Sequence, residues 1–156
     1  QTPMATWSEL VAADPELASA ARELLSVPGV GFGYLATVGR DGTPRIHPIN
    51  VVWVDGCLQA FIVPSPKLDD LRRSGQYALH STGSEDVDDE LAIRGRAREI
   101  ADPARRAAAV AACPFEPGDD HVLVELDLDH VLWGHYEPRG VFPPRYRGWR
   151  ASRRDP

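Results

Sequence analysis

The chain has 156 residues, of which 43% are apolar and 26% are charged, and its formal net charge is −6. This length suits one domain, and these proportions are ordinary for a globular protein. The net charge disfavours a nucleic-acid surface, no apolar run approaches the ~20 residues that span a membrane, and the first residues show no secretory signal. Two widely separated cysteines, Cys57 and Cys113, form no metal or disulfide pattern, so we expect a cytoplasmic protein.

Two short helices are expected before the first strand. Residues 6–9 fit a capping box, in which Thr and Glu side chains satisfy free amides at a helix start. Asp14-Pro15 fits the N-cap and first position of a second helix. Its apolar face is built from residues that recur at the helical period: Leu17, Ala20, Ala21, Leu24 and Leu25. The sequence Val27-Pro28-Gly29 ends this helix.

From Gly31 the pattern changes to that of strands. Three antiparallel strands are predicted over 32–38, 44–54 and 57–63. Hairpin turns join them, and Asp55-Gly56 is the stronger turn signal because a type I′ turn needs φ > 0 at both central positions. These strands are expected to form a meander.

The remaining segments follow the same periodicities. Gly95 is expected at a bulge or a bend. Residues 4–136 are predicted to form one domain, and residues 137–156, rich in Pro, Gly and Arg, an irregular tail. Helices are expected over 67–73 and 102–112, and strands over 76–80, 91–100 and 121–128, with a continuation after a kink over 131–136.

These elements make the chain mainly β, of the α+β class, with about six antiparallel strands and roughly two to four short helices. Short consecutive antiparallel strands favour a closed or nearly closed barrel, because closure removes exposed sheet edges. The sequence therefore predicts a small barrel.

A candidate anion site follows the third predicted strand. Lys67, the only lysine in the chain, stands at the start of a short helix, two residues after Ser65. Free N–H groups, a hydroxyl and an ammonium favour a phosphate, and Arg45 on the second strand would join them if the strands pair as proposed. The alternative is that these are ordinary surface residues, and the sequence leaves both interpretations open.

The chain shows no motif of metal, serine-nucleophile or dinucleotide chemistry. No pair of its five histidines has the spacing of helical metal ligands, no Ser lies in a G-x-S-x-G elbow, and no G-x-G-x-x-G or phosphate-binding loop occurs. We therefore expect no metal site and assign no catalytic residue.

Four segments, in this order, resemble the pyridoxamine 5′-phosphate oxidase-like family of flavin-binding split barrels. They are Tyr34-Leu-Ala-Thr-Val, Asp41-Gly-Thr-Pro-Arg-Ile-His-Pro-Ile, Asp55-Gly-Cys-Leu and Ser65-Pro-Lys-Leu-Asp-Asp-Leu. That group includes deazaflavin-dependent reductases and haem-degrading relatives. The resemblance implies a split β-barrel and a homodimer that holds the flavin in a groove between its subunits.

The resemblance also implies which residues contact the cofactor, with FMN expected and the deazaflavin coenzyme as the alternative. In this sequence they are Arg45, Ile46, His47, Pro48, Phe61, Ile62, Ser65 and Lys67. Arg45, Ser65 and Lys67 would hold the phosphate, and the others would line the ring or the ribityl chain. Hydride chemistry would belong to the flavin, while the protein binds and orients it for a small-molecule substrate that the sequence does not name.

The chain departs from pyridoxamine phosphate oxidases at Asn50, Pro66 and Glu90, where Lys, Arg and Gln are usual. It also carries Asp70, close to the expected phosphate, where deazaflavin relatives commonly carry Asn. Oxidation of pyridoxamine phosphate is therefore not implied. Two functions stay open: an FMN- or deazaflavin-dependent oxidoreductase, and a non-catalytic dimer that binds flavin or haem for storage or sensing. No nucleic-acid or membrane partner is expected.

Overall fold

The computed structural model describes residues 3–152, which contain four helices and eight strands. The predicted caps are present, since Thr6 and Glu9 form the reciprocal capping box and Asp14 accepts a hydrogen bond from the Leu17 amide. In chain order the elements are α1 (Trp7–Ala13), α2 (Pro15–Leu24), β1 (Phe32–Val38), β2 (Pro44–Asn50), β3 (Val52–Val54), β4 (Cys57–Ile62), α3 (Pro66–Ser74), β5 (Gln76–His80), β6 (Glu90–Glu99), α4 (Pro103–Ala112), β7 (Val122–His135) and β8 (Arg145–Arg150).

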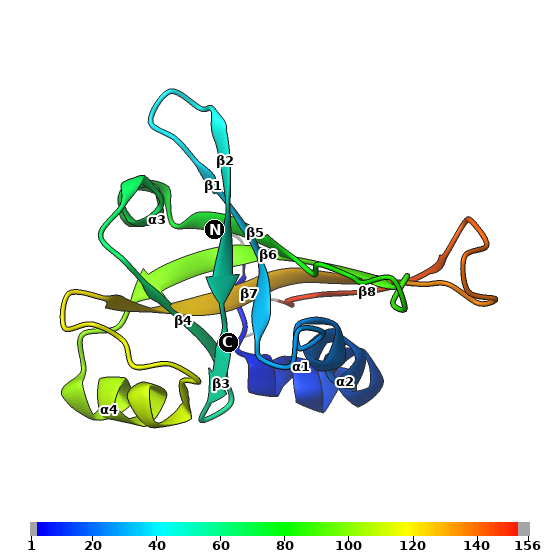
Figure 1. Ribbon diagram of the computed structural model, residues 1–156, viewed down its shortest axis with the longest axis horizontal. Helices are drawn as coiled ribbons and strands as arrows, with labels where there is room; N and C mark the ends of the chain where they lie inside the picture. The colour runs from blue at the N-terminus through cyan, green and yellow to red at the C-terminus, as the bar shows by residue number, and fades with distance from the viewer. Residues whose placement is uncertain (1–2, 153–156) are drawn as a thin grey trace.

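All strands belong to one antiparallel sheet that curls into a half-barrel (Figure 1). The order is β2-β1-β5-β6-β7-β4-β3, with β8 beside β7. On β1, β2 and β5 the outer face stays exposed. α4 covers the outer side of β3 and β4, and the inner face packs on α1 and α2 across an apolar core that includes Leu10, Leu17, Leu35, Leu79, Ile93 and Leu126. The predicted mainly β, antiparallel class is confirmed.

The predicted strand over 44–54 forms both edge strands of the sheet. It divides at Val51 into β2, which pairs with β1, and β3, which pairs with β4. At the division, the backbone N–H of Val51 and the side-chain Nδ2 of Asn50 both donate to the Gly31 carbonyl oxygen, each at 3.1 Å. A Cβ on Gly31 would lie 2.0 Å from the Val51 oxygen, so only glycine permits this approach. The predicted antiparallel pairing of the second strand with the first and the third is confirmed, but the two halves of the second strand lie at opposite ends of the strand order, so the three strands do not form a simple meander.

β7 is a single strand of 14 residues, where two shorter strands were predicted. Its register against β6 shifts once: Arg94 pairs with His130, Gly95 pairs with Leu128, and Asp129 is the extra residue. This bulge replaces the expected kink and lets β7 continue. Gly95 lies at the bulge as predicted, and a Cβ there would lie 1.8 Å from the backbone oxygen of Asp127.

The prediction of an irregular tail after residue 136 is wrong for residues 145–150. They form β8, which pairs with the second half of β7 from His130 to His135. Arg147 fixes β8 to the start of α2, because its guanidinium donates to Asp14 at 2.8 and 2.9 Å and to Glu16 at 2.7 Å. These Arg147 contacts are with residues more than a hundred positions away, which local composition cannot indicate. None of the described helices has the length and apolar character needed to cross a membrane.

We expect Gly31→Ala to lower the free energy of unfolding by about 1–3 kcal/mol, the usual cost of overpacking a tightly packed site. The added methyl would collide with the Val51 carbonyl at the point where the strand divides. Gly148→Ala is a matched control on β8, because its nearest atom would be Leu132 Cδ1 at 3.4 Å. Urea denaturation measures both variants, and equal midpoints would contradict the importance of the Gly31 contact.

Candidate functional site

β2 carries four of the eight predicted cofactor contacts and lies at one end of the sheet order. Among the described residues, β1 is its only strand partner. The Val51 N–H bonds to the Gly31 carbonyl of the paired segment, and such bonds alternate along an antiparallel pair. The N–H and C=O of Ile46 and the C=O of Pro48 therefore point away from β1. The outer edge of β2 therefore carries backbone groups that are not paired with another strand of the described chain.

Arg45, predicted to hold a phosphate, is paired with a carboxylate of its own chain. Its Nε donates to Oδ2 of Asp70 at 3.0 Å, and the same oxygen accepts from Thr37 Oγ1 at 2.8 Å. Arg73 Nη2 donates to the other oxygen at 3.1 Å. The Asp70 side chain is 3% exposed. Burial acts to raise the pKa of Asp70, but its three hydrogen bonds outweigh burial and hold the pKa below its ordinary value.

The other two members of the predicted phosphate site differ in their availability. Ser65 occupies the N-cap position of α3, but its hydroxyl donates to the backbone oxygen of Val63 at 2.7 Å and makes no cap hydrogen bond. Within residues 3–152, the Lys67 ammonium has neither an ion pair nor a hydrogen bond. Of Arg45, Ser65 and Lys67, only Lys67 has a side-chain polar group without a partner among residues 3–152.

His47 follows Arg45 on the same side of β2. Its Nε2 is buried and has no hydrogen-bond partner in the described part of the chain. Burial lowers the pKa of His47, and the positive charges of Lys67 and Arg45 lower it further. The imidazole is therefore neutral at physiological pH. No group of three His, Cys, Asp or Glu side chains between residues 3 and 152 is arranged to hold a metal ion.

Phe61 and Ile62, predicted to line the cofactor, are largely occupied by packing. Phe61 is 9% exposed, lies against Leu123, and has the Arg106 guanidinium 5.2 Å from its ring centre. Ile62 is 1% exposed and belongs to the main core. The structure thus brings the β2 residues, Lys67 and the Asp70 cluster together, and it leaves these two side chains mostly inside the protein.

A second buried polar cluster was not predicted from the sequence. Glu125 on β7 is 2% exposed and accepts hydrogen bonds from Gln59 Nε2 at 3.3 Å and from Arg98 and Arg105. Arg98 also donates to Asp127 at 2.6 Å. Burial raises the pKa of Asp127, although the Arg98 hydrogen bond opposes it. These side chains mainly satisfy one another and tie β4, β6, β7 and α4 together.

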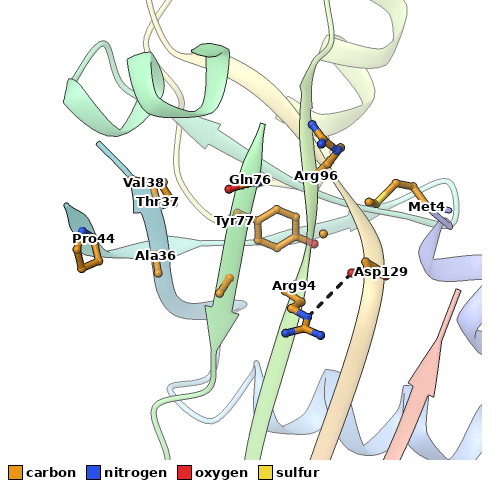
Figure 2. A pocket seen from close by; sticks show the side chains of 12 residues that line it. Met4, Ala36, Thr37, Val38, Pro44, Gln76, Tyr77, Arg94, Arg96 and Asp129 are labelled. Carbon is orange, nitrogen blue, oxygen red and sulfur yellow. Dashed lines mark ion pairs between the residues drawn. The ribbon is translucent and has the colours of Figure 1, made fainter. Parts of the chain in front are cut away.

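The exposed outer face of β1, β5 and β6 holds a groove of about 360 Å³. Figure 2 shows Ala36 and Pro44 on one side of it and Met4 and Asp129 on the other. Arg94 Nε faces Asp129 Oδ2 at 4.0 Å within the groove. None of the eight predicted contacts lines it, so the groove and the predicted site are separate features.

No protein-family model and no curated protein sequence matches the chain. Among solved structures, a haem-binding protein from Mycobacterium smegmatis matches 85% of this chain with a TM-score of 0.63 and 18% identity, and the match spans 58% of that protein. An FAD-binding protein from Mesorhizobium loti matches 73% of this chain and 91% of its own, with a TM-score of 0.56 and 22% identity. An F420 reductase matches 64% of this chain and 87% of its own, with a TM-score of 0.52 and 21% identity.

The chain has the split-barrel fold. The curled antiparallel sheet and these structural matches agree on it, and they confirm the fold that the sequence resemblance implied. The names of the matching proteins differ in ligand, from haem to FAD to F420, although the barrel is shared. A common barrel therefore does not define what is bound, and the residues at the site must do so.

We expect Asp70→Asn to lower the free energy of unfolding at neutral pH by about 1–3 kcal/mol. The value is modest for a buried ion pair because the Arg45 and Arg73 side chains are 39% and 31% exposed. The folded-state pKa of Asp70 is lowered, so its contribution is complete above the ordinary value of 3.8 and is lost as pH falls through the folded value.

Urea denaturation of both proteins as a function of pH measures this effect. The difference between wild type and Asp70→Asn should shrink in acid. Asp69→Asn, an exposed neighbour on the same helix, is the control and should match wild type at neutral pH. A difference between wild type and Asp70→Asn that stays constant into acid would show that the Asp70 charge does not stabilise the fold.

Proposed function

We propose that the chain binds a flavin-type cofactor, FMN or a deazaflavin coenzyme, along the free edge of β2 and near the start of α3, and that it acts as an oxidoreductase on a small molecule. The observation that carries this proposal is the unpaired backbone edge at Ile46 and Pro48, close to the uncommitted charge of Lys67. Split barrels with matching folds are named for FAD and F420, which supports a flavin-type ligand.

The residues of this site fit such a cofactor. A flavin ring carries alternating donors and acceptors along one edge, and the Ile46 N–H and C=O form the complementary pair on β2. Pro48 adds an acceptor without a donor, because proline has no N–H. The unpartnered Nε2 of His47 supplies one further polar contact. Lys67 is the group that would meet the cofactor phosphate.

A bound flavin would supply the hydride chemistry, and the protein would supply binding and orientation. Lys67 and the β2 edge would fix the two ends of the cofactor. No side chain of the chain is assigned a catalytic role, and the substrate is a small molecule of unassigned class.

We expect Lys67→Ala to weaken FMN binding about tenfold to a hundredfold, the effect of losing one charge-assisted hydrogen bond. Binding of riboflavin, which lacks the phosphate, should change little. Arg72→Ala is the control, because Arg72 lies about 140° around α3 from Lys67 and is paired with Glu99. Fluorescence titration measures both ligands. Equal losses for FMN and riboflavin would show that Lys67 does not contact the phosphate.

The absorbance of the purified protein distinguishes a flavin-dependent oxidoreductase from a non-catalytic haem-binding protein. A flavin spectrum, with reduction of the bound flavin by a panel of electron donors, supports the oxidoreductase. A haem Soret band would favour a non-catalytic haem-binding protein. Failure to take up FMN, deazaflavin or haem on titration would contradict both functions.

We also propose that a second copy of the chain covers the exposed outer face of the sheet. Tyr34 on β1 is 41% exposed and Ile46 on β2 is 66% exposed. Between and beside them stand small side chains, Ala36 and Ala78, that allow a flat surface to approach closely. A homodimer would bury this apolar area, and the cofactor on the β2 edge would then lie close to the subunit boundary.

We expect Ala78→Arg to convert the dimer to a monomer, because the long charged side chain would stand in the middle of the covered face. Ala111→Arg, on the exposed side of α4, is the matched control and should stay dimeric. Sedimentation equilibrium gives the mass of each variant. A monomeric wild-type protein, or an Ala78→Arg dimer, would contradict the proposed interface.

A further inference from the structure

The best-formed anion-binding geometry in the described residues is filled by the chain itself. A guanidinium from β2, a guanidinium from α3 and a hydroxyl from β1 converge on the Asp70 carboxylate, at 2.8 to 3.1 Å. Two cations and a hydroxyl around one buried anion make the donor set that a bound phosphate or carboxylate requires. Here the anion is a side chain.

Asp70 is the carboxylate in direct contact with the two guanidinium groups at this position. It is the only carboxylate within residues 3–152 that pairs with Arg45 or with Arg73. Lys67 stands three residues before it on α3 and is unpaired in the same range, so the helix places another positive charge nearby. Without Asp70, three cations would face this end of the barrel with no carboxylate in contact.

The cations remain reachable although the anion is buried. The Arg45 and Arg73 side chains are 39% and 31% exposed, whereas that of Asp70 is 3% exposed. A ligand anion can therefore approach the guanidinium groups from outside, but Asp70 already accepts from one nitrogen of each, Arg45 Nε and Arg73 Nη2, and occupies the position between them. Electrostatic repulsion between Asp70 and an incoming phosphate adds to this exclusion.

We propose that Asp70 is a built-in occupant of an anion site formed by Thr37, Arg45 and Arg73, and that it sets specificity by keeping the phosphate of a ligand out of that site. This deepens the proposed function, on which it rests for the identity of the ligand as a flavin. A flavin bound beside α3 then depends on Lys67 for its phosphate contact, and the chain prefers FMN to riboflavin less strongly than it would if Thr37, Arg45 and Arg73 were free to bind the phosphate.

The first experiment needs no flavin. The thermal midpoints of wild type and Asp70→Ala are measured with inorganic phosphate and with formate, each at constant ionic strength against chloride. Both anions should raise the midpoint of Asp70→Ala, because each can replace the missing carboxylate, and the response of wild type, in which Asp70 fills the site, should be smaller for both. Asp69→Ala should behave as wild type, and adding Arg45→Ala to Asp70→Ala should abolish the gain.

Three results would overturn the proposal. The first is an Asp70→Ala protein that is folded and responds to neither anion. The second is a wild-type response as large as that of the variant. The third is rescue by formate alone, since the vacated site would then not accept a phosphate. If Asp70→Ala does not fold, the titration is made on Asp70→Asn, which removes the charge with less change of volume. The same gain is expected there, and its absence would again overturn the proposal.

The second experiment tests whether Asp70 sets the preference between FMN and riboflavin. The ratio of FMN to riboflavin affinity is measured for wild type and Asp70→Ala, and we expect it to rise about tenfold or more in the variant, as one added charge-assisted contact predicts. An unchanged ratio would overturn the specificity role. If no flavin binds either protein, the proposed function fails, while the phosphate and formate results still decide whether Asp70 fills an anion site.

Discussion

The close approach of Gly31 to Val51 is the contact on which the half-barrel depends. At this contact the chain passes from β2, which pairs with β1, to β3, which pairs with β4. The two edge strands of the sheet are therefore consecutive in the chain. The curl that follows turns the inner face into a core with α1 and α2. It also leaves β2 at the end of the strand order, with a free edge. Fold and candidate site come from the same bend.

Buried charge in this protein is largely neutralised within the chain. Asp70 forms an ion pair with Arg45 at one end of the barrel, and Glu125 forms one with Arg105 of α4. Such pairing makes each cluster costly to break but leaves few cations for a ligand. Of the three residues predicted to hold a phosphate, only Lys67 carries a charge without an ion pair among residues 3–152, and the proposed ligand would take its other contacts mainly from the backbone of β2.

The residues predicted to hold a phosphate could be located from the sequence, but their partners could not. Arg45, Ser65 and Lys67 were recognised by residue type and order, and the structure does place β2 near the start of α3. What residue type could not show is that Arg45 and the Ser65 hydroxyl already have partners. Asp70 stood out in the sequence as an acid near a phosphate site, but its direction depends on how α3 packs on β1 and β2.

The sequence by itself determined the helices, their caps, most strand boundaries, the Asp55-Gly56 hairpin and the bulge at Gly95, because these depend on neighbours along the chain. Only the tertiary structure decided the division of 44–54, the strand at Arg145–Arg150 and the burial of Glu125. Glu125 alternates with apolar residues as a solvent-facing side chain would, and α4 covers it only after folding. Each of these features needs a partner that is distant in sequence, and a local pattern carries no information about that partner.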